Sequence, residues 1–177
     1  NCESLGAEYN GKQAGTFGLL GTFSSFFSHH ISTMEGGFVT TDDEELYHIL
    51  ISLRAHGWTR DLPKENMISN KSNDSFEESF RFILPGYNVR PLEMSGAIGI
   101  EQIKKLKKFL EQRRANAKLF MELFTDQPNF LIQKDSGKSS WFGFSIIINP
   151  KSNLNRKEVL KKLSDNLIEF RPIVGGN

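Results

Sequence analysis

The sequence predicts a mixed α/β fold, in which short strands and a helix are joined by a long helix to a smaller α/β unit. Three observations predict it. Residues 1–40 hold short apolar segments among many Gly, Ser and Thr, residues 91–126 carry an apolar stripe at helical spacing, and an apolar run at 141–149 precedes an amphipathic helix. The 177 residues suit about one domain. Because the chain opens without Met and ends in a turn sequence, we expect a fragment of a longer chain.

The first part of the chain is expected to form short strands followed by a helix. Apolar segments at residues 17–20, 22–27 and 38–40 are typical of strands separated by glycine turns. Residues 41–44, Thr-Asp-Asp-Glu, have the capping-box pattern, and acidic residues favour the start of a helix. The helix is expected to end at Gly57. Its apolar stripe consists of Leu46, Ile49, Leu50 and Leu53.

The rest of the chain is expected to hold a long loop, a long helix and a strand followed by a helix. Residues 59–82 are rich in turn formers, and a loop of this length indicates a functional or partner-contacting segment. Pro91 suits the first position of a second helix, whose stripe continues so far that we expect a kink or two consecutive helices. Residues 141–149 are expected to form a buried strand, and Asn155 to cap a third helix with Glu158 in its first turn.

Composition and charge argue against several classes of partner. About 38% of the residues are hydrophobic and 24% are charged, as in an ordinary globular domain. The 22 Lys and Arg residues balance 21 Asp and Glu residues, so there is no basic excess to attract nucleic acid or an anionic membrane. The apolar runs are too short to cross a bilayer, and the start lacks the features of a signal peptide. We therefore expect a cytoplasmic protein with no nucleic-acid and no membrane partner.

Common catalytic and metal-binding motifs are absent from the sequence. Cys2 is the only cysteine, so these residues cannot build a disulfide, a zinc cluster or a protein-ligated iron–sulfur cluster. The four histidines are not at ligand spacing, and we expect no metal site. No serine-hydrolase elbow, P-loop or dinucleotide-binding fingerprint is present. The lysines at 104–108 lie among Glu101, Gln102 and Glu111, and the apolar stripe continues through them, which favours a solvated helix face over an anion site.

Residues 23–40 form the most distinctive motif of the sequence. It reads Phe-Ser-Ser-Phe-Phe-Ser-His-His-Ile-Ser-Thr-Met-Glu-Gly-Gly-Phe-Val-Thr. This resembles the signature of the DegT/DnrJ/EryC1/StrS sugar aminotransferases, which are pyridoxal-phosphate enzymes. In that family a phosphate-binding Ser precedes the Schiff-base Lys, and Glu-Gly-Gly follows it. Ser24 and the Glu-Gly-Gly at 35–37 lie at the family spacing, and His29 occupies the position of the lysine.

Further motifs extend the resemblance over nearly the whole chain. Residues 1–18 resemble the family segment after the cofactor-binding Asp, with Glu3 in register. Residues 54–57 resemble the family's Arg-x-His-Gly helix end. Residues 86–91 resemble its Gly-Tyr-Asn-x-Arg motif, and the run at 99–106 matches the next segment of the family pattern. The Asp that pairs with the pyridine ring is expected just before the first residue.

The resemblance implies the PLP-dependent transferase fold of type I, the aspartate aminotransferase-like fold. Residues 1–100 are then expected to be the C-terminal part of the large cofactor-binding domain. Residues 101–177 are expected to be the connecting long helix and an incomplete small C-terminal domain. Active sites in the family are shared between subunits, so the resemblance also implies a homodimer.

The replacement of Lys by His at position 29 is the departure that bears most on function. An aminotransferase needs the lysine as an imine-forming amine and as a base. An imidazole cannot hold the cofactor covalently, but it can move a proton near neutral pH. The departure resembles the dehydratase branch of the family. There, L-glutamate converts pyridoxal 5′-phosphate to pyridoxamine 5′-phosphate, and a nucleotide-linked 4-keto sugar loses its C3 hydroxyl, with release of ammonia.

Three alternatives to that interpretation stay open at this point. A second dehydratase branch also has His for Lys but needs an iron–sulfur cluster, and the lone Cys2 favours the cluster-free branch. A nucleotide-sugar 4-aminotransferase is opposed by the missing lysine. An inactive homologue is opposed by the retained Ser24, Asn88 and Glu-Gly-Gly residues.

The resemblance assigns candidate roles to eight residues, each of which could instead be an ordinary structural or surface residue. His29 is expected to be the base, with the adjacent His30 as the alternative register. Ser24 is expected to donate to the cofactor phosphate and Glu3 to lie by the cofactor ring. Asn88 is expected to reach the phosphate across the dimer interface. The candidates for binding the nucleotide sugar or L-glutamate are Arg90, whose guanidinium fork suits a carboxylate or a phosphate, and more weakly His56, Arg60 and Arg171.

Overall fold

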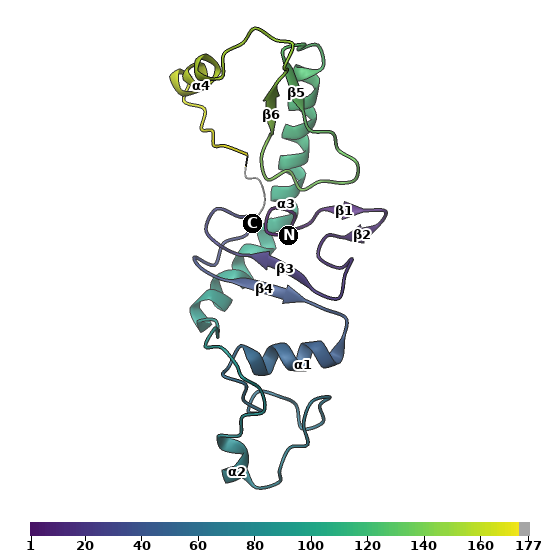
Figure 1. The fold of residues 1–177 in the computed structure, drawn as a ribbon, viewed down its shortest axis with the longest axis vertical. Coiled ribbons are helices and arrows are strands. Elements are labelled where there is room, and N and C mark those ends of the chain that lie inside the picture. Colours follow the sequence, from purple (N-terminus) through teal and green to yellow (C-terminus); the bar gives the residue numbers. More distant parts are fainter. Residues whose placement is uncertain (174–177) are drawn as a thin grey trace.

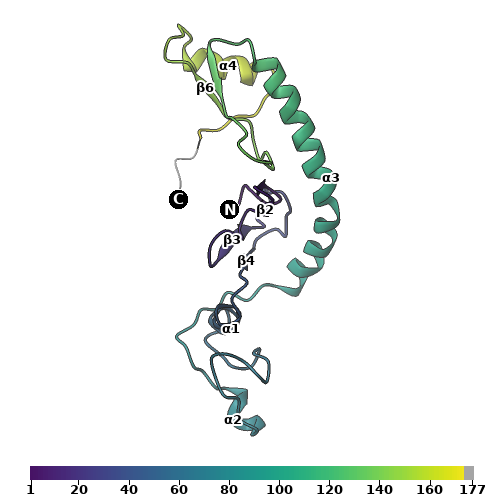
Figure 2. The ribbon, with the colours of Figure 1, turned by 90° about the vertical axis from the view of Figure 1, so that its right-hand side faces the viewer.

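The computed structural model describes residues 1–173, and its elements are arranged along one long curved helix (Figure 1). This helix, α3 (Glu93–Phe124), has 32 residues, so it is about 48 Å long at the usual rise per residue. Two hairpins lie on its concave side, as Figure 2 shows. Helices α1 and α2 lie beyond the start of α3, and the last strands and helix lie at its far end.

The two hairpins are antiparallel and close in sequence. Strands β1 (Glu8–Tyr9) and β2 (Lys12–Gln13) form the first, and β3 (Gly21–Ser24) and β4 (Gly37–Thr40) form the second. β3 and β4 confirm the strands expected within 22–27 and 38–40. The strand expected at 17–20 is wrong: these residues form bends, and the Leu19 carbonyl accepts a hydrogen bond from the Thr41 hydroxyl at 2.8 Å.

Helix α1 (Glu44–Leu53) confirms the first predicted helix, but its cap differs from the prediction. Asp43, not Thr41, is the N-cap, and its carboxylate accepts from the Leu46 amide at 2.9 Å. The predicted apolar stripe is only half-buried, and the buried residues of the helix are His48 and Ser52. The helix ends at Leu53 with Arg54 as its C-cap, so the predicted end at Gly57 is wrong. Gly57 lies in the turn that follows, with a φ of +84°, and a Cβ there would collide with the Leu84 carbonyl, which explains the glycine.

The predicted loop at 59–82 contains a short helix, α2 (Ser75–Ser79). Asp74 caps it by accepting from the Phe76 and Glu77 amides. Isolated bridges at Trp58–Phe82 and Ala55–Asn88 tie the two ends of this region together. The segment is therefore a folded protrusion rather than an open loop.

Helix α3 is continuous, so the expected kink or pair of helices is wrong. No proline lies inside its bounds, and its length is accommodated by the smooth curvature in Figure 2. Leu92 is the N-cap, which places Pro91 one residue before the cap and not at the first helical position. The helix crosses residue 100, and the division of the chain at that point stays a prediction.

The last elements are β5 (Phe130–Ile132), β6 (Ile146–Ile148) and α4 (Arg156–Asp165). β5 and β6 pair antiparallel. Only the end of the run at 141–149 is a strand, because the Trp141 and Phe142 carbonyls accept from a side chain of α3 instead of a neighbouring strand. Asn155 confirms the predicted cap of α4: its side chain accepts from the Lys157 amide at 2.9 Å. Glu158 lies in the first turn, as predicted.

The described chain buries little of its apolar surface. Its accessible surface is 13062 Å², whereas a compact monomer of its mass would expose about 8,700 Å². The buried hydrophobic residues are Phe23, Ile31, Ala55, Leu62, Ala117 and Trp141. Within residues 1–173, no helix is both long and apolar enough to cross a membrane.

Candidate active site

The loop between β3 and β4, residues 25–36, carries the histidine pair. Ser25 organises this loop: its amide donates to the Gly36 carbonyl at 3.0 Å, and its hydroxyl lies 2.6 Å from that of Thr33. Gly36 has a φ of +142°, which a side chain rarely permits. Gly37 pairs with Ser24, and a Cβ at Gly37 would meet the Phe23 carbonyl. The two glycines of the predicted signature are therefore required by the backbone of this loop.

Ser24 ends β3 at the point where this loop begins. It is half-buried, and its hydroxyl oxygen accepts from the Phe26 amide at 3.2 Å. A hydroxyl that accepts one hydrogen bond still has its own proton to donate. Ser24 can therefore donate to an anion such as a phosphate oxygen.

The two adjacent histidines have different environments. His30 is 3% exposed, and its Nε2 lies 3.1 Å from the Ser140 carbonyl. Because a carbonyl only accepts, His30 holds its proton on Nε2, and burial lowers the pKa of its imidazole. The Nδ1 atoms of both rings are buried with no hydrogen-bond partner among the described residues, but His29 is only half-buried and forms no hydrogen bond through Nε2 either. Of the two, His29 is the one whose ring nitrogens are uncommitted.

Glu3 and Arg171 join His29 around one aromatic ring, and we call these three residues with Phe142 the Phe142 cluster. The His29 ring is stacked on Phe142, with centroids 5.6 Å apart and an interplanar angle of 28°. The Arg171 guanidinium lies 5.3 Å from the centroid of the same ring. Its Nη2 is 3.5 Å from the Glu3 carboxylate. The structure thus brings together residues from the start, the middle and the end of the described chain.

Three further predicted site residues form a second group around Trp58. We call His56, Trp58, Arg60 and Arg90 the Trp58 cluster. The His56 ring lies 5.2 Å from Trp58, and the guanidinium groups of Arg60 and Arg90 lie 4.1 and 5.4 Å from it. Asn88 is exposed on the strand-like segment that bridges to Ala55, two residues before Arg90. The guanidinium groups of Arg60 and Arg90 and the nearby amide of Asn88 are thus presented at the surface.

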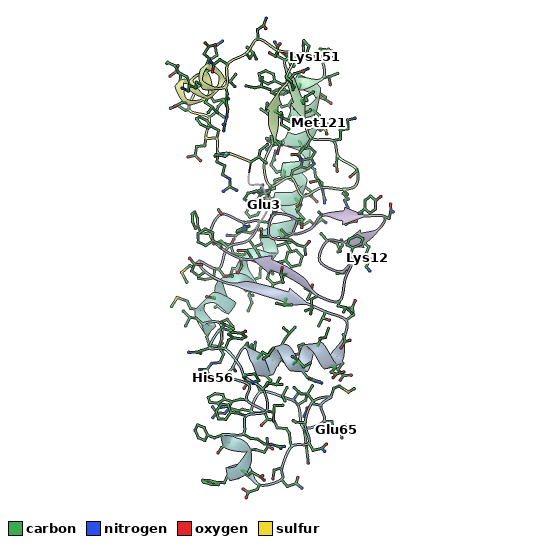
Figure 3. All side chains as sticks on the ribbon, viewed as in Figure 1. Glu3, Lys12, His56, Glu65, Met121 and Lys151 are labelled. Atoms are coloured by element: carbon green, nitrogen blue, oxygen red, sulfur yellow. The ribbon has the colours of Figure 1, made fainter. Side chains whose placement is uncertain are left out.

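The Phe142 cluster and the Trp58 cluster lie at separate places in the structure. In Figure 3, Glu3 lies beside the hairpins and His56 lies on the other side of β3 and β4, near the end of α1. The sequence did not predict this division, since spacing along the chain does not show which motifs meet. Trp58, at the centre of the second cluster, was also missed, although it directly follows the Arg-x-His-Gly motif. Phe142 was expected only as a strand residue.

A carboxylate network supports the Trp58 cluster. Glu78 accepts hydrogen bonds from the Ser72 amide at 2.6 Å and from the Thr59 hydroxyl and the Arg81 guanidinium at 2.8 Å each. These bonds, that of the Ser72 amide above all, lower the pKa of Glu78 to about 2. Arg60 in turn donates to the Ser79 carbonyl at 2.9 Å. The network fixes both ends of the protrusion that carries Trp58 and Arg60.

No cluster of three or more His, Cys, Asp or Glu side chains suited to a metal ion occurs within the described part of the chain.

Comparison with known proteins finds close relatives across the whole sequence. The chain is 67% identical over its full length to the GDP-4-keto-6-deoxy-D-mannose 3-dehydratase of Yersinia pseudotuberculosis. It is 63% identical to the enzyme of that name from Escherichia coli O55:H7. The chain spans 45% and 46% of these two relatives. GDP-perosamine synthase of Escherichia coli O157:H7 is 29% identical over 97% of the chain and 42% of its own length.

Solved structures confirm the predicted fold class. The E. coli GDP-4-keto-6-deoxy-D-mannose-3-dehydratase with bound hydrated PLP matches all of this chain and 46% of its own, with a TM-score of 0.96 and 63% identity. A GDP-4-keto-6-deoxymannose-3-dehydratase with a trapped PLP-glutamate geminal diamine also matches all of this chain and 46% of its own, with a TM-score of 0.96 and 62% identity. ColD is a name for GDP-4-keto-6-deoxymannose-3-dehydratase. A ColD variant with a His-to-Lys and a Ser-to-Asn substitution at adjacent positions matches all of this chain and 47% of its own, with a TM-score of 0.96 and 62% identity.

The profile of the DegT/DnrJ/EryC1/StrS aminotransferase family matches residues 1–175. With the motif spacing, the loop geometry and the relatives above, this match settles the predicted family. The chain belongs to the DegT/DnrJ/EryC1/StrS aminotransferase family.

Proposed function

We propose that the protein is a PLP-dependent nucleotide-sugar 3-dehydratase. Its substrate is GDP-4-keto-6-deoxy-D-mannose and its amino donor is L-glutamate, and its products are the 4-keto-3,6-dideoxy sugar and ammonia. The observation that carries the proposal is the uncommitted His29 at the lysine position of a loop that is otherwise built as the family signature predicts. The two dehydratase relatives above, each matched along the whole of this chain, support it.

The residues present fit a cofactor that is bound without a covalent link. Segment 23–40 contains no lysine, and the free proton of Ser24 suits a phosphate oxygen. Ser24 and Glu3 of this chain, with Asn88 of a second copy, would hold pyridoxal 5′-phosphate or pyridoxamine 5′-phosphate. When bound, the cofactor supplies the electron sink for the chemistry at the sugar.

His29 is proposed as the base that moves a proton between cofactor and sugar. A general base needs a nitrogen that is free to accept a proton. The half-buried His29 meets this condition, because its ring nitrogens have no hydrogen-bond partner among the described residues. The substituted ColD positions support the choice of His29 over His30. The substituted residues are an adjacent Ser and His, and the only Ser-His pair of this sequence is Ser28-His29.

The separation of the clusters supports a homodimer with shared active sites. Arg171 lies with His29 in the Phe142 cluster, so it is proposed to bind the substrate in the site of its own chain. His56, Arg60 and Arg90 lie in the Trp58 cluster, and we propose that they and Asn88 serve the site of the other subunit. Arginine forks in that place suit the carboxylate of L-glutamate or the phosphates of the nucleotide.

We also keep the predicted division of the chain as part of this proposal. Residues 1–100 would belong to the large cofactor-binding domain, and residues 101–177 would form the connecting helix and part of the small domain. The protein would act in the cytoplasm, where its nucleotide-sugar substrate would be made.

The alternative reaction is transfer of the amino group to C4 of the sugar. It is opposed by His29, because an aminotransferase uses a lysine amine there. GDP-perosamine synthase, at 29% identity, is also much less similar to this chain than the dehydratases.

One experiment separates the two reactions. The full-length protein is incubated with pyridoxal 5′-phosphate, L-glutamate and GDP-4-keto-6-deoxy-D-mannose, and the products are followed by mass spectrometry and an ammonia assay. Release of ammonia with loss of the C3 oxygen is the expected result. A stable GDP-4-amino sugar that keeps its C3 hydroxyl would overturn the proposal.

A further inference from the structure

We propose that Phe142 is a positioning residue for His29, and that Arg113 holds Phe142 in place through the backbone. The proposal rests on the role of His29 given above. It adds a device in which an aromatic ring, fixed from the long helix, sets the orientation of the base.

The backbone at 139–142 is held by side chains from outside the segment. The Ser139 carbonyl accepts from Arg114 Nε at 3.0 Å, and the Ser140 carbonyl lies 3.1 Å from His30 Nε2. The Trp141 and Phe142 carbonyls both accept from Arg113 Nη1, at 2.9 and 3.0 Å. Four successive carbonyls are therefore occupied, three of them by guanidinium groups of α3, and hydrogen bonds from charged donors are the stronger kind.

The conformation of this segment is unusual for its residue types. Trp141 has a φ of +49°, which costs energy for a bulky residue and persists only where the surroundings hold it. Its side chain is 3% exposed and packs into the interior. The turn at Trp141 leaves the next side chain, Phe142, half-exposed. Phe142 is therefore directed to a neighbour other than the core.

The Phe142 ring is stacked on His29, and it also lies 5.9 Å from the His30 ring and 5.3 Å from the Arg171 guanidinium. The stacked ring of Phe142 restricts the rotation of the imidazole about its last side-chain bond, and Phe26 lies edge-on 6.3 Å from His29. A base works only when its nitrogen is within reach of the proton, and displacement by about 1 Å can cost a hundredfold in rate. His29 has no hydrogen-bond partner on Nδ1 among the described residues, so the aromatic contacts are what orients it.

The test compares Phe142→Leu, Phe142→Tyr and Phe144→Leu in the full-length holoenzyme. Phe144 is the control for a lost aromatic ring nearby, because it lies two residues after Phe142, stacks on Phe120 and contacts Trp141 but not His29. Phe142→Leu is expected to lower kcat of dehydration about tenfold or more. KM for the GDP sugar is expected to change less, through the contact of the same ring with Arg171. Phe142→Tyr, which keeps the ring, is expected to restore kcat to within about twofold, and Phe144→Leu to keep the wild-type kcat.

A spectroscopic readout reports the position of His29 directly. The ring current of Phe142 shifts the carbon-bound imidazole protons of His29, whose NMR signals are assigned as those lost in His29→Asn. Phe142→Leu and Arg113→Met are expected to move these signals, and Phe142→Tyr and Phe144→Leu to leave them in place. If Arg113→Met does not fold, the two Phe142 variants still decide the question.

The outcomes separate this inference from the proposed function. A wild-type protein that does not dehydrate the GDP sugar overturns the proposed function, whatever the NMR signals show. An active wild type in which Phe142→Leu changes neither kcat nor the His29 signals overturns the inference alone. A Phe142→Tyr variant as impaired as Phe142→Leu also overturns it, because the ring would then not be the feature that matters.

Discussion

At the scale of single residues, the backbone of the loop that carries His29 is fixed by residues other than His29. The positive φ of Gly36, the close approach at Gly37 and the β3 terminus at Ser24 all fix the backbone without involving the side chain at position 29. A lysine amine can form an imine with the carbonyl carbon of a cofactor, and an imidazole cannot. The proposed replacement of covalent attachment by proton transfer at position 29 therefore requires no change in this backbone.

His29→Lys is expected to restore covalent attachment of the cofactor and to abolish dehydration, because an amine replaces the imidazole. Borohydride reduction followed by intact mass measurement checks the attachment, and ammonia release checks the activity. His29→Asn is the control, since it removes the base without supplying an amine. A lysine variant that dehydrates at the wild-type rate would show that His29 is not the base.

Ser24→Ala is expected to weaken binding of pyridoxal 5′-phosphate about tenfold or more, because it removes a hydrogen-bond donor to a charged phosphate. Titration of the apoenzyme, followed by the absorbance of the cofactor, measures the change in Kd. Ser28→Ala is the matched control, as Ser28 is exposed on the same loop. Equal affinities in the Ser24 and Ser28 variants would contradict the assignment of Ser24.

At the scale of elements, the protrusion at 59–82 depends on one carboxylate. Glu78 joins the Ser72 amide, Thr59 and Arg81, so it connects the two ends of the segment with the turn between them. This arrangement places Arg60 over Trp58 without help from a large apolar core. The protrusion is thus held mainly by polar contacts.

Glu78→Gln is expected to loosen the protrusion at neutral pH, seen as faster hydrogen exchange in peptides from 59–82. The folded-state pKa of Glu78, about 2, lies below the ordinary value of 4.5. The charged carboxylate therefore stabilises the segment fully above about pH 4.5, and this contribution declines as the pH falls from there through about 2. The difference between wild type and variant should shrink over the same range. Glu77→Gln, an exposed neighbour, is the control and should exchange as the wild type does.

The elements that could be predicted from the sequence are those with local causes. The Asn155 cap and the β3 and β4 strands follow from neighbours in sequence. The end of α1 was placed too late, at Gly57, because that glycine is required by the close approach of the Leu84 carbonyl and not by the helix end. The cap at Asp43 was misplaced because Thr41 and Asp43 are both good capping residues in one short run. The run at 141–149 was overestimated as a strand because Arg113 and Arg114 take carbonyls that a ladder would use, and no local pattern shows such a contact. For the same reason Phe142 could not be found beside His29.

At the scale of the whole molecule, six of the eight predicted site residues fall into two clusters at separate places in the structure. Ser24 lies at the start of the loop that carries His29, and Asn88 lies two residues before Arg90. A C2 dimer brings the same patch of each subunit onto the other, so a residue far from its own site can complete its partner's. The exposed position of Asn88 and the arginines of the Trp58 cluster is what such an arrangement needs.

Mixing two inactive variants tests this arrangement. If Asn88 serves the partner's site, a hybrid of His29→Asn and Asn88→Asp subunits contains one intact site. Random exchange of subunits should then restore about a quarter of the wild-type activity. The control mixes His29→Asn with Glu3→Ala, because both residues belong to the Phe142 cluster of one chain and no hybrid site is intact. Recovered activity in the control mixture would contradict the shared site. So would the absence of any recovered activity in the first mixture.

The large accessible surface of the described chain has a practical consequence for handling it. Apolar side chains such as Phe76, Leu92 and Ile100 are more than half exposed, and uncovered patches of this kind cause self-association. A polypeptide of these 177 residues produced alone should therefore bind hydrophobic dyes, precipitate at modest concentration and be cut readily by proteases. A lack of dehydratase activity in such material would reflect its loss of solubility rather than its chemistry. The catalytic experiments therefore use the full-length protein.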